Sequence, residues 1–281
     1  MNDLRSLYLE LLKRTLIDLN HPRPVEFRPA QTGRKVNLLI RPLLRLFRAM
    51  DKRELFLCDK VSFNTDDRMN GKDWPPFAET MIGYKRLSNV QYCVEEVIRN
   101  NVPGDLIETG VWRGGTVIFM RAILKAYEVT DRRVWAADSF EGLPKPDPGK
   151  YAADKDDIFY TFDELKVTLD DVRKNFEKYG LLDDQVRFLK GWFKDTLPVA
   201  PVEKLAVLRL DGDMYESTMD ALVSLYPKLS PGGFIIIDDW GVVEGCRLAV
   251  EDYRKQQQIT DEIIPIDEDG VYWQKKPGAN S

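Results

Sequence analysis

Four aspartates stand at the ends of two apolar runs and could together hold a divalent cation. Asp211 and Asp213 follow the run Val207-Leu-Arg-Leu, and Asp238 and Asp239 follow three isoleucines. Such runs predict buried strands, and strand ends of an open α/β sheet face the crevice where ligands bind. Carboxylates gathered there with no basic partner in the pattern repel one another unless a cation is shared between them, and Mg²⁺ prefers oxygen ligands. The pattern therefore predicts a metal or catalytic site; the alternative is that Asp and Gly merely end the strands in turns.

A glycine-rich turn after an earlier apolar run predicts a cofactor loop. The run Leu106–Thr109 leads into Gly110, Gly114 and Gly115. Glycines let the backbone bend sharply and let a ligand approach closely. The spacing differs from that of dinucleotide and phosphate-binding loops, and no lysine follows, which argues against a phosphate ligand. The alternative is a turn that only packs a helix on a strand.

Two acids at strand ends indicate which ligand this loop would bind. Asp138 ends the next apolar run, 23 residues past Gly115, and is followed by Ser139. A carboxylate at that place can accept both hydroxyls of a ribose. Glu108 would suit a cationic amino-acid group, so the two acids favour S-adenosylmethionine as the cofactor. The later triplet Gly191-Trp192-Phe193 would suit an adenine platform, although aromatic residues are often plain core.

Composition excludes several classes of protein. The chain has 281 residues and 43% apolar content, enough for one α/β domain with additions. Its net charge of −5 argues against a nucleic-acid binder. The three cysteines Cys58, Cys93 and Cys246 are far apart, which suits reduced thiols better than a disulfide framework or a zinc site. No apolar run reaches membrane-spanning length and the start lacks a signal-peptide core, so we expect a cytoplasmic protein.

The single histidine limits the chemistry of the site. His21 precedes Pro22 and is expected to be a turn residue, so a Ser/His/Asp or Cys/His nucleophilic apparatus is disfavoured. A general base would then be a carboxylate, a lysine or a tyrosine.

The elements that position these residues alternate regularly from residue 81 onward. Alternating strands and helices indicate crossover units and a mainly parallel sheet. We expect helices over residues 87–98, 116–127, 162–179, 217–229 and 246–257. We expect strands over residues 106–109, 134–138, 186–190, 206–210, 233–237, 263–266 and 271–274.

The N-terminal region differs in character. Residues 1–53 carry 12 Lys and Arg against 5 Asp and Glu. Residues 3–19 have the apolar spacing of an amphipathic helix, and a proline-rich linker is expected after them. Residues 37–50 are both basic and apolar, and could lie on an anionic membrane, cover a partner or pack on their own domain. Residues 54–78 read as loop-rich.

The chain resembles the macrocin O-methyltransferase family, whose members methylate sugar hydroxyls of macrolides and aminocoumarins in antibiotic biosynthesis. The resemblance covers residues 4–18 and 73–275 almost without gaps. It is carried by the segments Leu7–Arg14, Thr80–Leu87, Gly104–Gly115, Ala137–Pro144, Gly191–Pro198, Leu208–Leu222 and Gly270–Trp273.

This resemblance implies a class I methyltransferase (Rossmann-like) fold that uses S-adenosylmethionine and Mg²⁺. It implies Asp211, Asp238 and Asp239 as the metal ligands and Asp213 as the general base that takes the proton from the acceptor hydroxyl.

The resemblance also implies roles for the N-terminal part. Met81 and Tyr84 would lie in the segment that closes over the cofactor, and the N-terminal helix would contribute to a lid and to a homodimer. We therefore expect a helical extension and lid over residues 1–79, with a basic apolar insertion, and a methyltransferase domain over residues 80–281.

The expected function is O-methylation of a small-molecule natural product, on a deoxysugar of a glycosylated metabolite. One alternative is a metal-dependent methyltransferase of a polyketide or catechol-like hydroxyl, and another is a non-catalytic module that binds an adenosine ligand. A nicotinamide-dependent oxidoreductase is disfavoured by the glycine spacing and by Glu108. Residues 22–59 are longer than the connection expected in relatives and lie beside the expected acceptor entrance, so the sequence leaves the acceptor undetermined.

Overall fold

A seven-stranded, mainly parallel sheet forms the centre of the protein, as the alternating pattern predicts. The computed structural model describes residues 4–20, 25–29 and 58–276. The strand order is β5-β4-β3-β6-β7-β9-β8, with β3 to β7 parallel and β9 antiparallel to both of its neighbours. The bounds are β3 Asp105–Thr109, β4 Val134–Asp138, β5 Val186–Lys190, β6 Leu205–Leu210, β7 Leu229–Ile237, β8 Ile264–Pro265 and β9 Val271–Gln274.

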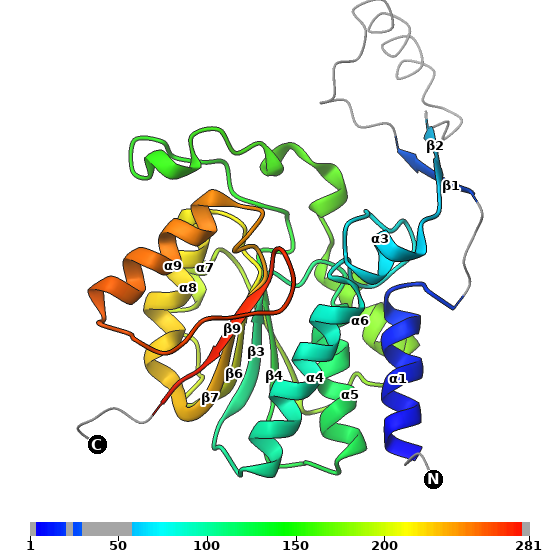
Figure 1. Cartoon of the computed structure of the whole chain (residues 1–281), viewed down its shortest axis with the longest axis horizontal. Coiled ribbons are helices and arrows are strands. Elements are labelled where there is room, and N and C mark those ends of the chain that lie inside the picture. The colour runs from blue at the N-terminus through cyan, green and yellow to red at the C-terminus, as the bar shows by residue number, and fades with distance from the viewer. Residues whose placement is uncertain (1–3, 21–24, 30–57, 277–281) are drawn as a thin grey trace, which may run out of the picture.

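Helices cover both faces of this sheet (Figure 1). One face carries α4 (Gly83–Arg99) and α5 (Gly115–Ala126), with α1 (Leu4–Leu16) packed outside them and α6 (Leu169–Lys178) on the same side. The other face carries α7 (Phe193–Thr196), α8 (Tyr215–Leu225) and α9 (Glu244–Gln256). Two separate apolar clusters correspond to the two faces.

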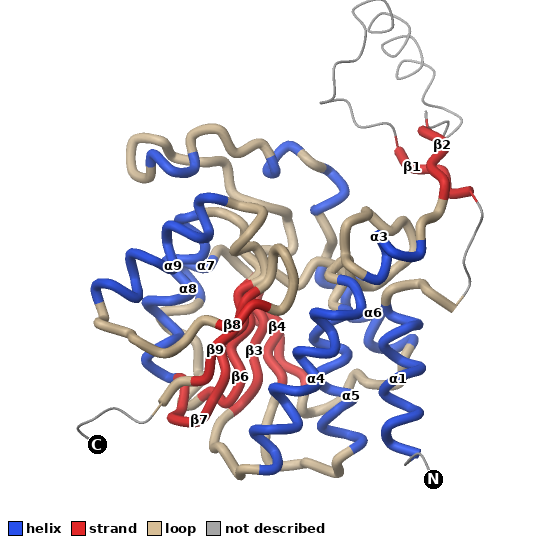
Figure 2. The backbone as a smooth tube through the Cα atoms, in the orientation of Figure 1, coloured by secondary structure: helices blue, strands red, loops and turns tan. Residues whose placement is uncertain are grey.

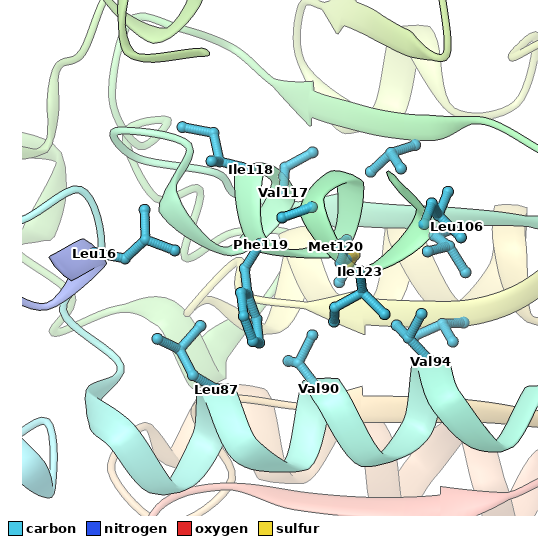
Figure 3. Close-up of a cluster of buried hydrophobic side chains, with 14 of the residues drawn as sticks. Leu16, Leu87, Val90, Val94, Leu106, Val117, Ile118, Phe119, Met120 and Ile123 are labelled. Carbon is cyan, nitrogen blue, oxygen red and sulfur yellow. The ribbon is translucent and has the colours of Figure 1, made fainter. Parts of the chain in front are cut away.

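The larger cluster explains why α5 is mostly apolar. Figure 3 shows Leu87 and Val90 of α4 pointing at α5, with Leu16 of α1 reaching the same cluster. Phe119 and Ile123 of α5 are fully buried there. Because α5 is enclosed by the sheet, α4 and α1, its residues from Gly115 to Leu124 are all buried, and burying its side chains stabilises the region that holds the glycine turn.

The predicted helix over residues 162–179 is shorter in the structure. It begins at Leu169, because Thr168 caps it by accepting a hydrogen bond from the backbone N–H of Asp171 at 3.2 Å. The preceding residues form three short 3₁₀ turns instead. They belong to a long loop after β4 that crosses above the end of the sheet (Figure 2).

The N-terminal linker and loop predictions were incomplete. Val25–Pro29, expected as linker, is strand β1 and pairs antiparallel with β2 (Cys58–Ser62). Within the loop-rich stretch, α3 (Thr65–Met69) is capped by the Asn64 side chain. His21 and the basic apolar residues 37–50 lie outside the described residues. In the described part of the chain, no helix combines the length and apolarity needed to cross a membrane.

Candidate active site

One cavity opens where the carboxyl ends of β3, β4, β6 and β7 meet. It encloses about 630 Å³, which exceeds what a small ion or a single sugar ring would fill. Most of the residues predicted from sequence line it: Met81, Glu108, Gly110, Asp138, Ser139, Trp192, Phe193, Asp211, Asp213, Asp238 and Asp239. Segments that are far apart in the sequence therefore contribute to a single site.

The carboxylate cluster forms as the strand-end pattern predicts. Asp211 follows β6, and Asp238 and Asp239 follow β7, the next strand in the sheet. Each offers one oxygen such that the three oxygens lie within 4.8 Å of one another. Asp238 and Asp239 are buried and Asp211 is half-buried. Adjacent parallel strands end at the same edge, which is why residues 27 positions apart can gather here.

The sequence interpretation missed two basic partners of this cluster. Arg209, completely buried within β6, donates hydrogen bonds to Glu108, to Asp238 and to Oδ2 of Asp211, the last at 2.7 Å. Arg86 of α4 donates to the other oxygen of Asp238 at 2.6 Å. The expectation that the carboxylates have no basic partner was therefore wrong. The sequence pattern does not show where the side chain of Arg209 points. The apolar residues around it suffice to predict a buried strand, so the arginine itself was not taken as part of the site.

Arg86 extends the network to a turn on the far side of the site. It also donates to Asp267 at 2.9 Å and to Asp269 at 3.1 Å, both in the turn between β8 and β9. Asp269 lines the cavity. The carboxylates outnumber the two arginines, so the site keeps an excess of negative charge.

That excess shifts the acids towards their neutral forms. Burial and the nearby charge of Asp238 raise the pKa of Asp211 to about 6. Burial, followed by the charges of neighbouring aspartates, holds the pKa of Asp213 and of Asp239 well above the usual range. Burial raises the pKa of Glu108 to about 8 despite its contact with Arg209. A bound cation would relieve this repulsion, so the donor chemistry fits a divalent metal ion.

Asp213 is held in an unusual backbone conformation. Its φ is +56°, in the left-handed region that few residues other than glycine adopt. Its backbone N–H donates to Oδ2 of Asp239 at 3.2 Å. The N–H of Met214 donates to the carbonyl of Gly212 at 2.6 Å, which tightens the turn. The turn places Asp213 beside the metal-ligand candidates and half-exposed in the cavity.

The cofactor loop is joined directly to the carboxylate cluster through Gly110. Its φ is +82°, and a Cβ there would lie 1.7 Å from the carbonyl oxygen of Asp211. Only glycine allows the loop and the end of β6 to approach this closely. Asp138 ends β4 in the same cavity and accepts hydrogen bonds from the backbone N–H groups of Val111 and Phe140, at 2.8 and 2.6 Å.

Four of the predicted cofactor residues do not line the cavity. A Cβ on Gly114 would meet Val172 at 2.8 Å, one on Gly115 would meet Glu79 at 2.6 Å, and one on Gly191 would meet Thr196 at 2.7 Å. At these three positions a side chain would press against a neighbouring segment, and their contact with the cofactor stays a prediction. Tyr84 faces α1, where its hydroxyl donates to Glu10 at 2.5 Å.

An aromatic part of the cavity wall was not foreseen. Trp74 and Phe159 line the cavity, and each makes an edge-to-face contact with Phe162, at 5.8 and 5.7 Å between ring centroids. Trp74 comes from the segment before α4 and the two phenylalanines from the long loop after β4. No local pattern in either irregular segment marks these side chains as neighbours.

Comparison with known proteins decides between the possible readings of this cavity. Residues 5–275 match the family described as macrocin-O-methyltransferase (TylF). The chain belongs to this family. It is therefore an O-methyltransferase enzyme, and the family implies S-adenosylmethionine as methyl donor.

Individual relatives agree with this assignment. Demethyldecarbamoylnovobiocin O-methyltransferase of Streptomyces niveus is 55% identical over 224 residues, 79% of this chain and 86% of the relative. The 8-demethyl-8-(2,3-dimethoxy-alpha-L-rhamnosyl)-tetracenomycin-C 4'-O-methyltransferase of Streptomyces olivaceus is 51% identical over 272 residues, 96% of this chain and 93% of the relative. The solved structure of the O-methyltransferase NovP matches with a TM-score of 0.83 at 46% identity, covering 97% of this chain and all of that one. The expected class I methyltransferase fold is thus confirmed.

Proposed function

We propose that this enzyme transfers a methyl group from S-adenosylmethionine to a sugar hydroxyl of a glycosylated natural product, with Mg²⁺ bound by Asp211, Asp238 and Asp239. The observation that carries the proposal is the convergence of these three carboxylates in the same cavity as Gly110 and the ribose-binding candidate Asp138. The relatives' names support the sugar hydroxyl, since one acts on a rhamnosyl tetracenomycin.

The cofactor half of the cavity fits an adenosine ligand that carries positive charge. Two oxygens of Asp138 are fixed by backbone N–H groups and retain lone pairs that a ribose can use. Glu108 Oε2 is buried and has no hydrogen-bond partner among the described residues. A buried acceptor without a partner is costly, and a ligand amino group would satisfy it. Met81 and Trp192 line the walls of the same cavity and offer apolar surface.

The metal site follows from the chain's own donors. Asp211, Asp238 and Asp239 would hold the ion, and Arg209 and Arg86 fix the orientation of Asp238 from both of its oxygens. When bound, Mg²⁺ would supply a Lewis acid that lowers the pKa of a coordinated hydroxyl. Because Asp238 is held in this orientation before the reaction, little free energy is spent on moving the charged groups during the reaction.

We propose Asp213 as the general base. Its turn is tied to the metal-ligand candidate Asp239, and its side chain lines the cavity. Burial is the first cause that raises its pKa above the usual range and would persist with the ion bound, which makes it a better proton acceptor than an ordinary aspartate. In this proposal Asp213 takes the proton of the acceptor hydroxyl and the enclosing walls align the acceptor oxygen with the donor methyl.

Trp74 and Phe159 would contact the acceptor. Sugar rings and aglycones have apolar faces that pack on aromatic side chains, whereas the opposite wall is acidic. The same acidity disfavours an anionic acceptor such as a nucleotide-linked sugar, because Asp213, Asp239 and Glu216 line the cavity.

The proposal is tested by incubating the purified enzyme with S-adenosylmethionine, Mg²⁺ and a panel of glycosides, their aglycones and nucleotide-linked sugars. Mass spectrometry should show addition of one methyl group to glycosides alone, located on the sugar by fragmentation. Methylation of free aglycones with no reaction on glycosides would contradict the proposal and favour the polyketide or catechol-like alternative.

Replacing Asp213 by asparagine should lower kcat on the order of 10²-fold, the usual contribution of a general base. The affinity for S-adenosylhomocysteine, measured by calorimetry, should change little because Asp213 lies outside the cofactor half. Asp184→Asn, an exposed acid before β5, provides the matched control and should leave kcat unchanged. Equal kcat in the Asp213 variant and the wild type would remove Asp213 from the mechanism.

The homodimer and the division at residue 79 remain proposals. Helix α1 exposes Leu4, Leu7 and Leu11 by 82%, 50% and 60%, an apolar strip that a second copy would cover. Light scattering after gel filtration should give the mass of two chains for the wild type and of one chain for Leu7→Glu/Leu11→Glu. A wild-type enzyme with the mass of one chain would overturn the dimer.

A cytoplasmic location is likewise proposed, and cell fractionation would test it.

A further inference from the structure

The long loop after β4 is fastened to the first turn of α8 by a buried aspartate. Asp154 is only 3% exposed, although it lies in a loop that crosses above the sheet (Figure 1). Its Oδ1 accepts the backbone N–H of Tyr215 at 2.7 Å, and its Oδ2 accepts that of Glu216 at 3.0 Å. Both oxygens of one carboxylate therefore bind consecutive N–H groups of α8.

Asp154 does for α8 what a capping residue normally does. The N-cap residue of α8 is Met214, whose side chain makes no capping hydrogen bond. The first N–H groups of a helix need acceptors, and a carboxylate is a favourable one because of the helix dipole. Here the acceptor comes from 61 residues away along the chain. The start of α8 thus depends on where the loop lies.

The neighbouring helix is shaped to admit this carboxylate. A Cβ on Gly245, near the start of α9, would lie 2.9 Å from Asp154 Oδ1 and 3.0 Å from the N–H nitrogen of Tyr215. A side chain at residue 245 would therefore press against both partners of the hydrogen bond. Glycine at this place keeps the space that the contact requires.

Two further contacts join the same parts. The rings of Tyr151 and Tyr215 lie 5.2 Å apart between centroids, and Lys150 pairs with Glu216 at 2.8 Å. The lysine is half exposed, so its pair contributes little. The buried Asp154 contact is the one able to fix geometry.

The turn that holds Asp213 lies directly before the first turn of α8 that Asp154 caps. Asp213 stands two residues ahead of Tyr215 in a left-handed conformation with φ of +56°. Such a conformation is unfavourable for aspartate and persists only where the surrounding structure holds it. On one side the turn is held by Asp239, and on the other side it continues directly into the capped first turn of α8.

We propose that Asp154 is a positioning residue for Asp213, so that the loop covering the cavity must be seated on α8 before the carboxylate of Asp213 reaches its working place. The proposal rests on the role of Asp213 in the proposed function. In this proposal, the position of the loop after β4 determines the position of Asp213 through the two hydrogen bonds that Asp154 accepts from the backbone of α8.

The test compares Asp154→Ala, Asp154→Asn and Gly245→Ala with the wild type. Asp154→Ala should lower kcat about 10- to 100-fold, as expected for misplacement of a reacting group by about 1 Å. The dissociation constant of S-adenosylhomocysteine should stay within about twofold, because no cofactor residue contacts Asp154. Asp154→Asn keeps one acceptor oxygen and should recover most of the lost kcat.

Gly245→Ala should lower kcat as Asp154→Ala does, and the double variant Asp154→Ala/Gly245→Ala should lose less than the product of the two single effects. Lys155→Ala, the exposed neighbour, serves as control.

A second readout does not depend on catalysis. Amide hydrogen exchange at Tyr215 and Glu216 should quicken in Asp154→Ala and Gly245→Ala, and stay at the wild-type rate in Lys155→Ala. Unchanged exchange at these amides, or an equal fall of kcat in Asp154→Asn and Asp154→Ala, would overturn the inference. If the wild type methylates no glycoside while exchange responds as expected, the proposed function fails and the fastening of α8 by Asp154 stands.

Discussion

Replacing Asp211 by alanine will abolish metal-dependent methyl transfer, with a fall in kcat on the order of 10³-fold, because a Lewis-acidic ion supplies several kcal/mol of transition-state stabilisation. Asp211 is one of the three carboxylates whose oxygens lie within 4.8 Å. Of the two that remain, Asp238 would still be paired with Arg209 and Arg86, and the two carboxylates would bind a divalent ion weakly. The measurement is the steady-state rate with and without added Mg²⁺.

Two controls separate loss of the ion from loss of the fold. The variant should still bind S-adenosylhomocysteine, because Asp138 and Gly110 are untouched. Asp131→Ala removes an acid whose side chain is 79% exposed, and should behave as the wild type. Full activity of the wild type in excess chelator would refute the metal's role, even if Asp211→Ala were inactive.

Replacing Arg209 by methionine will destabilise the protein by about 3–5 kcal/mol, the usual cost of leaving buried charges without their partner. Arg209 is completely buried and donates to Glu108, Asp211 and Asp238 at once. Methionine fills similar space, so the loss of stability reports the removal of the positive charge and not a change in packing. The measurement is chemical denaturation of the metal-free enzyme.

The destabilisation should depend on pH with a definite sign. Burial raises the pKa of Glu108 to about 8, above its unfolded value of 4.5. An acid raised in this way is best accommodated when protonated, so its contribution to stability falls as pH rises between those two values. Arg209 lowers the pKa of Glu108 and of Asp211, which burial raises to about 8 and about 6, so its removal would raise both further. The cost of Arg209→Met should therefore be smallest below pH 6 and should grow as the pH rises past the wild-type pKa of each acid.

A matched arginine provides the comparison. Arg121 is also buried, but its partner Asp183 has a side chain that is 37% exposed and can return to water. Arg121→Met should thus cost clearly less. At a pH well above 8, where Glu108 ionises, adding Glu108→Gln to Arg209→Met should restore part of the lost stability, since it removes one of the stranded charges. Equal losses in Arg209→Met and Arg121→Met would show that the three carboxylates do not depend on Arg209.

The strand ends were predictable from sequence because burial of a strand on both faces leaves an unbroken apolar run. Asp211, Asp238 and Asp138 each follow such a run, and parallel pairing then brings them to one edge. The family resemblance added the expected roles. What the pattern could not give was direction, so Tyr84, expected near the cofactor, contacts α1 instead.

Features that depend on long-range contacts were missed for a physical reason. Two of the partners of Arg209, Glu108 and Asp238, come from other strands or their ends, and no local spacing encodes them. The pairing of β1 with β2 joins segments more than twenty residues apart, one of them rich in proline. The aromatic wall of Trp74 and Phe159 arises in irregular segments, where no periodicity indicates which side chains meet.

The most direct test is anomalous diffraction from crystals grown with S-adenosylhomocysteine and soaked in Mn²⁺, which takes the same oxygen ligands as Mg²⁺. A single strong peak among the carboxylates that follow β6 and β7, in the cavity that also holds the nucleoside, is the predicted result. Density for the nucleoside with no anomalous signal at those carboxylates would mean that the enzyme activates its acceptor without an ion.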